Sequence, residues 1–127
     1  MIENCTILHT YSRKEAIADG VLVDVTDAAK EAGFRIPVAL TSAVWAKYVA
    51  IPNGVVGQDE SGRLWDVLWM LYVAIRANRN AKGHLRYRLH VRNDNRSGQA
   101  PLVELKALCG PDDDGAPCIT VMLPNED

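Results

Sequence analysis

Residues 63–92 read RLWDVLWMLYVAIRANRNAKGHLRYRLHVR, and within this stretch the hydrophobic pattern changes from one period to another. In its first half, apolar residues recur at spacings of three and four, as they do on the buried side of a helix. These residues are Leu64, Leu68, Leu71, Tyr72 and Ile75. We therefore expect one long central helix from Arg63 to about Asn80, packed against a core.

Tryptophans and Val73 widen the apolar stripe of this helix to most of its circumference. Large aromatic side chains dominate protein cores, so the simplest prediction is that Trp65, Trp69 and the earlier Trp45 are buried. A helix that is apolar nearly all round is hard to bury completely within 127 residues. An exposed apolar side would favour self-association through the long helix, and the sequence leaves both alternatives open.

From His84 the pattern alternates with a period of two, which is typical of a half-buried strand. One set of side chains is apolar, namely Leu85, Tyr87, Leu89 and Val91. The other set is basic, namely His84, Arg86, Arg88, His90 and Arg92. We expect the basic set to project into water from one face of a sheet.

Two further strands are expected after this one. Residues 93–98 have the composition of a turn, and apolar residues alternate with Glu104 and Lys106 in a strand over residues 102–108. A second polar turn, residues 110–117, precedes a strand over residues 118–123. The simplest assembly is a three-stranded antiparallel meander packed on the long helix.

Short elements are expected before the long helix. Ser12 and Glu15 fit a capping box that begins a helix ending near Gly20. The apolar, β-branched residues 21–25 form an extended segment or a fourth strand. A second helix, with Asp24 or Thr26 as its cap, ends at Gly33.

The segment from residue 36 to residue 62 is expected to hold one more helix. Ile36-Pro37 predicts an extended link, because the residue before proline avoids helical angles. Thr41 caps a helix that ends before Pro52, and residues 53–62 form an exposed loop. Taken together, the sequence predicts one α+β domain over residues 1–127, with short N-terminal helices and one long central helix packed on a three- to four-stranded antiparallel sheet.

The composition is that of a globular protein, with 48% hydrophobic and 24% charged residues. No apolar run approaches the about 18 residues of a membrane span, and the N-terminus lacks the apolar core of a signal peptide. We therefore expect a cytoplasmic protein without a membrane segment. Its three cysteines are too few for a disulfide scaffold and are expected to be reduced.

Charge is unevenly distributed along the chain. The net charge is −2 overall, but residues 76–96 carry seven basic residues against the single acid Asp94, so that they hold +6 and the remainder −8. Arginine binds carboxylates and phosphates bidentately, which indicates a non-enzymatic binding or accessory protein that contacts an acidic protein or a nucleic acid. The candidate partner-binding residues are Arg76, Arg79, Lys82, Arg86, Arg88, His90 and Arg92.

A plainer interpretation of the same charges stays open. Cations on an outer face keep an edge strand from pairing with other molecules. Glu104 and the turn Asp112-Asp113-Asp114 are the acids that could neutralise them within the chain.

Catalytic and metal-binding motifs are missing from the sequence. No C-x-x-C, H-x-x-x-H, G-x-S-x-G or phosphate-binding glycine loop occurs. Cys109 and Cys118 bracket a turn and could face each other on adjacent strands. We expect no catalytic residue, metal or cofactor; the alternative is a small hydrolase or metal-dependent enzyme built from His9, His84, His90 and the cysteines.

The stretch HTYSR at residues 9–13, AIADGVLVDVT at 16–26 and AGFRIPVALTSAVW at 32–45 resembles a family of small uncharacterised bacterial proteins. That family is associated with plasmids, phages and other mobile elements. The resemblance is specific over residues 9–45 and looser beyond. It implies an accessory role in a mobile genetic element and supplies no activity or catalytic residue.

Overall fold

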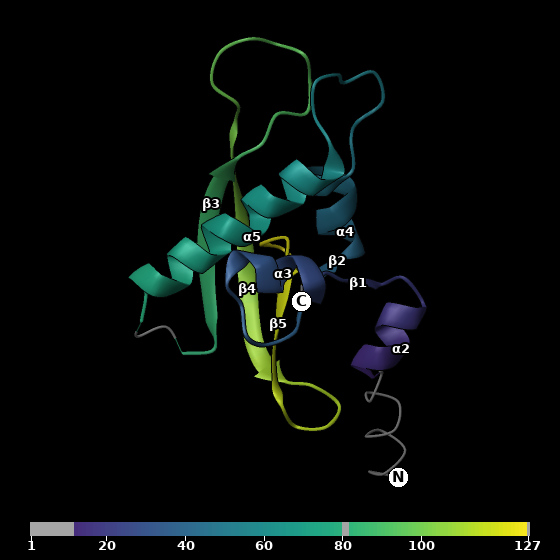
Figure 1. Cartoon of the computed structure of the whole chain (residues 1–127), viewed down its shortest axis with the longest axis vertical. Helices are drawn as coiled ribbons and strands as arrows, with labels where there is room; N and C mark the ends of the chain where they lie inside the picture. Colours follow the sequence, from purple (N-terminus) through teal and green to yellow (C-terminus); the bar gives the residue numbers. More distant parts are fainter. Residues whose placement is uncertain (1–11, 80–81, 127) are drawn as a thin grey trace.

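The computed structural model describes residues 12–79 and 82–126, which form an α+β fold (Figure 1). The helical elements are α2 (Arg13–Ala18), α3 (Thr26–Ala32), α4 (Ser42–Val44), the π-helical turn η1 (Trp45–Val49) and α5 (Glu60–Ala77). The strands are β1 (Leu22–Asp24), β2 (Val38–Thr41), β3 (His84–His90), β4 (Leu102–Pro111) and β5 (Pro117–Met122). Among the described helices, none is long and apolar enough to cross a membrane.

The five strands form one mixed sheet in the order β1-β2-β5-β4-β3. The antiparallel meander β3-β4-β5 and the strand within residues 21–25 are confirmed. The expectation of a purely antiparallel sheet is wrong, because β2 pairs in parallel with β5. Val38, Ala39 and Leu40 are fully buried, so this strand has apolar residues on both faces and lacks the alternation that reveals a half-buried strand.

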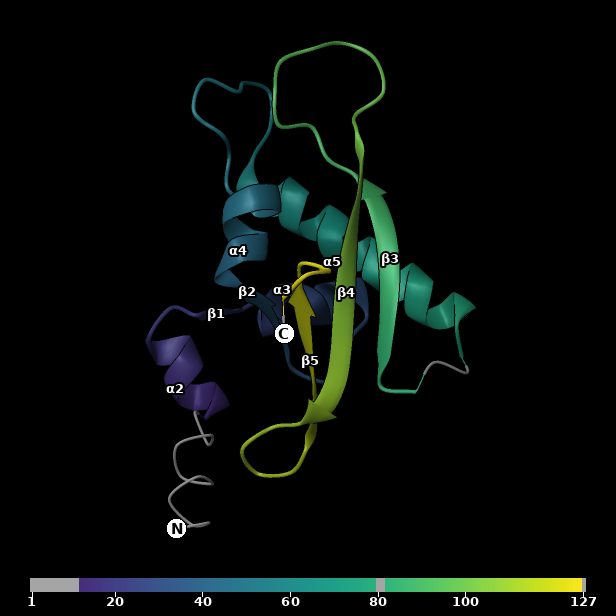
Figure 2. The ribbon, with the colours of Figure 1, turned by 180° about the vertical axis from the view of Figure 1, so that it is seen from behind.

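The inner side of α5 packs on one face of the sheet. Val67, Leu68 and Leu71 are fully buried there, against β-strand residues that include Tyr87 and Leu105. The hydroxyl of Tyr87 donates to the carbonyl oxygen of Val67 at 3.1 Å. Figure 2 shows the opposite face, where none of the described helices crosses β3 or β4. The helices therefore cover this part of the sheet from one side only.

Local signals of the sequence fix the helix ends. The capping box is present, with the Ser12 hydroxyl accepting from the Glu15 amide at 2.9 Å. The helix α3 ends at Gly33, which has φ of 111° and whose added Cβ would lie 2.9 Å from Cε1 of Tyr72. The long helix begins three residues earlier than expected, because the Asp59 carboxylate caps it by accepting from the Gly62 amide at 2.6 Å.

The prediction that the tryptophans are buried is wrong for two of them. Trp65 is 41% exposed and Trp69 is 42% exposed, whereas Trp45 is half-buried against the core. β3, α3 and η1 pack against α5, and the part of the helix surface that carries these two rings is left in solvent. The rings stack on each other instead, with centroids 5.9 Å apart.

A buried arginine joins the start of α5 to the end of β3. Arg63 is 6% exposed. Its guanidinium donates to the carbonyl oxygens of Val49 at 3.1 Å and Arg92 at 2.6 Å. It also donates to the side-chain oxygens of Gln58 at 3.0 Å and Asn93 at 2.6 Å. The planar fork of arginine thus satisfies acceptors from three separate segments.

We predict that Arg63→Met lowers the free energy of unfolding by about 2 to 4 kcal/mol, because it leaves buried carbonyl oxygens without donors. Urea denaturation followed by circular dichroism measures this. The control is Arg35→Met at an exposed arginine, for which we expect a change below about 0.5 kcal/mol. Equal effects of the two substitutions would contradict the role assigned to Arg63.

Candidate functional site: a cationic sheet face

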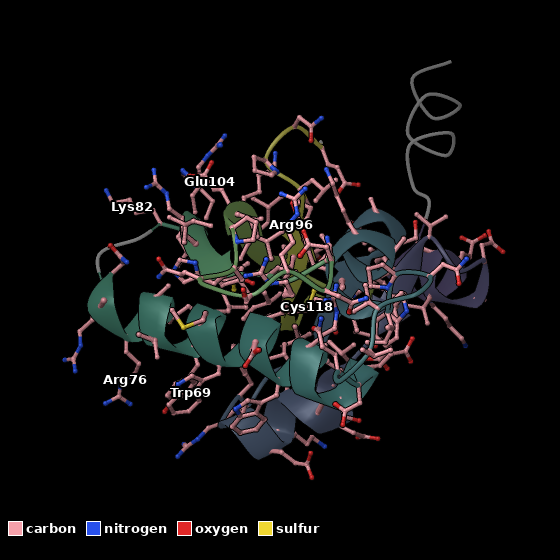
Figure 3. All side chains as sticks on the ribbon, turned by 90° about the horizontal axis from the view of Figure 1, so that it is seen from above. Trp69, Arg76, Lys82, Arg96, Glu104 and Cys118 are labelled. Carbon is pink, nitrogen blue, oxygen red and sulfur yellow. The ribbon has the colours of Figure 1, made fainter. Side chains whose placement is uncertain are left out.

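The expected alternation of side chains along β3 is confirmed. Tyr87 and Leu89 are buried and Leu85 is half-buried, whereas His84, Arg86, Arg88 and His90 are exposed. We call the exposed basic side chains His84, Arg86, Arg88 and His90 of β3, with Lys106 of β4, the cationic face. It lies on the side of the sheet that faces away from α5, where Figure 3 labels Glu104 and Lys82.

The backbone of the same residues is also accessible, because β3 is an edge strand. The carbonyl oxygen of Gly83 accepts from the Cys109 amide at 2.7 Å, and the Val91 amide donates to Pro101 at 3.0 Å. In an antiparallel pair every second residue is hydrogen-bonded to the partner strand. The odd-numbered residues between these two positions therefore bond to β4, and the N–H and C=O groups of Arg86 and Arg88 point to the open edge.

The two central arginines of the cationic face share a single carboxylate. Oε1 of Glu104 lies 3.2 Å from Nη1 of Arg86, and its Oε2 lies 3.8 Å from Nε of Arg88. Lys106 donates to the backbone carbonyl of Glu126. Among the described residues, Glu104 therefore pairs with the two arginines and not with Lys106, and exposed pairs of this kind contribute only about 0 to 1 kcal/mol each.

His90 is held in a fixed orientation at the end of the strand. Its Nδ1 lies 2.8 Å from the carbonyl oxygen of Ala100, so Nδ1 carries the proton and donates. Its Nε2 lies 3.3 Å from Nε2 of Gln99, which can then donate to it. His90 is therefore oriented by the loop that follows β3.

Arg92 does not project from the sheet with the other basic residues, as the sequence predicts. The strand ends at His90, and Arg92 bends back to Asp94 at 2.9 Å and to the carbonyl oxygen of Gly98 at 2.7 Å. Hydrogen bonds from the Arg96 amide and from Arg92 lower the pKa of Asp94. The side chain of Arg92 is 19% exposed, so it stabilises the turn over residues 93–98 and is not available to a partner.

The three remaining basic residues predicted for the site lie elsewhere. Arg76 projects outward from α5 (Figure 3), and its guanidinium lies 5.8 Å from the ring centre of Tyr72. Arg79 lines an apolar cavity of about 240 Å³ between the end of α5 and the sheet. Lys82 is exposed just before β3 and lines a hollow beside His84. Lys82 and Arg79 thus both line hollows that include His84 of the cationic face, whereas Arg76 lies apart from it.

The aspartate turn does not neutralise the cationic face. The Asp113 carboxylate accepts from the backbone amides of Arg13 at 2.8 Å and Lys14 at 3.0 Å. Both hydrogen bonds lower the pKa of Asp113, and the one from the Lys14 amide has the larger effect. The turn instead binds the start of α2, and neutralisation within the described residues comes from Glu104.

His84, Cys109 and Cys118 line one open hollow, but the two thiols do not face each other. In the β4-β5 register Cys109 lies opposite Ile119 and Cys118 opposite Gly110. This offset of one residue places the two thiols on opposite faces of the sheet, and both are free. Burial raises the pKa of Cys118.

Within the described ranges, no group of three His, Cys, Asp or Glu side chains is placed to hold a metal ion. His84 and His90 are at opposite ends of β3, about 20 Å apart. His9 lies outside the described residues, as does Cys5. Among the described residues, those of the alternative enzyme hypothesis therefore form no three-ligand metal site.

We predict that Asp113→Asn lowers the stability at pH 7 and that this loss shrinks as the pH falls. The lowered pKa means that the folded state gains stability above the ordinary aspartate pKa of about 3.9 and loses it as the pH drops through the folded-state value. Urea unfolding at neutral and acidic pH measures the difference. Asp114→Asn in the same turn is the control, and a loss independent of pH would contradict the charge-dependent bond to α2.

Comparison with known proteins yields one match. Residues 1–127 match the profile described as "Family of unknown function (DUF6573)". No curated protein and no solved structure matches the chain. Because the match covers the whole chain, the protein belongs to this family of unknown function, DUF6573.

Proposed function

We propose that this chain is a non-enzymatic binding protein that takes an extended acidic segment of a partner protein along β3. The proposal rests on two features that Arg86 and Arg88 combine. Their side chains belong to the cationic face, and their backbone groups point to the open edge of the sheet. A partner strand can therefore bind by backbone hydrogen bonds and by charge at the same residues.

The spacing of the arginines suits a strand. Alternate residues of a strand lie about 6.6 Å apart, so carboxylates on alternate residues of an added strand would meet Arg86 and Arg88 in turn. The guanidinium of arginine binds a carboxylate bidentately. Charges on the edge exclude neutral and basic strands, and the same charges would select an acidic one.

Nucleic acid fits the cationic face less well. Single-stranded nucleic acid is commonly bound by bases stacking on aromatic side chains. On this face of β3 and β4 the described residues include Leu102, Glu104 and Leu108 but no Trp, Tyr or Phe.

The proposal also includes the biological role of the protein and its location in the cell. The resemblance over residues 9–45 supports an accessory role in a mobile genetic element, and the composition supports a cytoplasmic location. The metal-dependent form of the enzyme alternative has no three-ligand group among residues 12–79 and 82–126 to support it.

The test uses a fluorescein-labelled peptide of alternating glutamate and valine, as long as β3, in a fluorescence anisotropy titration. We expect salt-sensitive binding that weakens about tenfold or more in the double variant Arg86→Glu with Arg88→Glu. The matched control, Arg35→Glu with Arg96→Glu, makes the same charge change at exposed residues outside the cationic face and should bind like the parent protein.

Two further probes separate strand addition from other modes. A peptide of the same sequence with alternate backbone amides N-methylated keeps its carboxylates but cannot complete the backbone hydrogen bonds, so it should bind at least about tenfold more weakly. Equal binding of the methylated peptide contradicts strand addition. Tighter binding of labelled single- or double-stranded DNA than of the peptide, lost in the Arg86 and Arg88 variant, contradicts a protein partner and indicates nucleic acid.

A further inference from the structure

The cavity between the end of α5 and the sheet is lined mainly by apolar side chains. It has a volume of about 240 Å³. Its apolar lining comes from the helix, from the link before β2 and from three strands, with a thiol beside it: Ile36, Ile75, Leu85, Ala107, Ile119 and Cys109. A concave apolar space with a few polar groups is the usual form of a small-molecule site.

The cavity exists because α5 ends before the strands beneath it do. The helix ends at Ala77, whereas β4 continues to Pro111. Leu105 is fully buried, but Cys109, on the same face of the same strand, is exposed. The small side chain of Ala107 lies between them and leaves space that a larger residue would fill.

The polar part of the lining is basic. Arg79 lines the cavity just beyond the end of α5, and no acidic residue is found among the described lining residues. Arg79 forms no salt bridge with any residue in the described ranges. A guanidinium without a carboxylate, beside an apolar space, is complementary to a ligand with an apolar body and an anionic end.

Size and charge restrict the ligand further. An apolar cavity of about 150 Å³ binds benzene, so this larger cavity has room for a ring that carries a short substituent. A carboxylate matches the parallel N–H donors of one guanidinium. A phosphate monoester carries a charge of about −1.5 to −2 at neutral pH, which is more than a single arginine neutralises.

We propose that this cavity binds a small apolar carboxylate, with its ring or chain between Ile75 and the sheet and its carboxylate at Arg79. The cavity lies on the face of the sheet that α5 covers, whereas the arginines of the cationic face project from the other face. The proposal therefore goes beyond the proposed function and does not depend on it.

Titration of isotope-labelled protein with phenylacetate, followed by two-dimensional NMR, tests the site. We expect the amide signals of Leu85, Ala107 and Cys109 to shift, with a dissociation constant on the order of 0.1 to 1 mM. The amide signal of Leu102, at the other end of β4, should stay in place. Phenylacetamide has the same shape without the charge and should bind about tenfold more weakly.

Substitutions separate the charge from the apolar space. Arg79→Gln should weaken phenylacetate binding about tenfold and leave phenylacetamide binding unchanged. The matched control, Arg76→Gln, makes the same change on α5 at a residue outside the cavity lining and should bind like the parent chain. Ala107→Leu fills the cavity and should abolish binding of both compounds; circular dichroism shows whether this variant is folded, and the exposed Arg79 position serves if it is not.

Three results would overturn the proposal. The first is that the three amide signals do not shift at phenylacetate concentrations up to about 10 mM. The second is equal affinity for phenylacetate and phenylacetamide. The third is equal phenylacetate binding by the Arg79→Gln and Arg76→Gln variants.

Discussion

Burial of the inner side of α5 is the constraint on which the other features depend. Val67, Leu68 and Leu71 have to leave water, and the sheet provides one face for them. The buried guanidinium of Arg63 then ties the start of the helix to the segment after β3 through the carbonyl oxygen of Arg92. With the helix fixed on this side, the opposite face of β3 and β4 and the outer side of α5 both remain exposed. Both exposed surfaces follow from the same packing.

The cationic face has its properties because β3 is an antiparallel edge strand, in which odd- and even-numbered residues face different surroundings. Side chains alternate between faces, and backbone hydrogen bonds alternate between the partner strand and the open edge, with the same period of two. In β3 these two alternations are in phase, so Arg86 and Arg88 present a cation and free backbone groups together. A register shifted by one residue would have placed Tyr87 and Leu89 in solvent. The core residues of β3 therefore determine the chemistry of its exposed residues.

Much of the fold could be predicted from local signals, because capping boxes, left-handed glycines and hydrophobic periods act over a few residues. The Ser12 capping box, the end of α3 at Gly33 and the alternation along β3 are examples.

The strand β2 could not be found this way, because a short strand buried on both faces has no hydrophobic period. Its parallel pairing with β5 joins residues about eighty apart in sequence. Likewise, the exposure of Trp65 and Trp69 depends on how many layers cover α5, which periodicity does not report. Within the candidate site, the pairing of Arg92 with Asp94 depends on where β3 ends, and the position of the aspartate turn depends on α2.

Hydrogen–deuterium exchange of the free protein, read at single residues by NMR, tests the open edge of β3 most directly. The account predicts slow exchange for the amides of Leu85, Tyr87 and Leu89, which donate to β4, and fast exchange for the amides of Arg86 and Arg88. Slow exchange of all five amides would mean that the outer edge of β3 is already paired, and it would contradict the account.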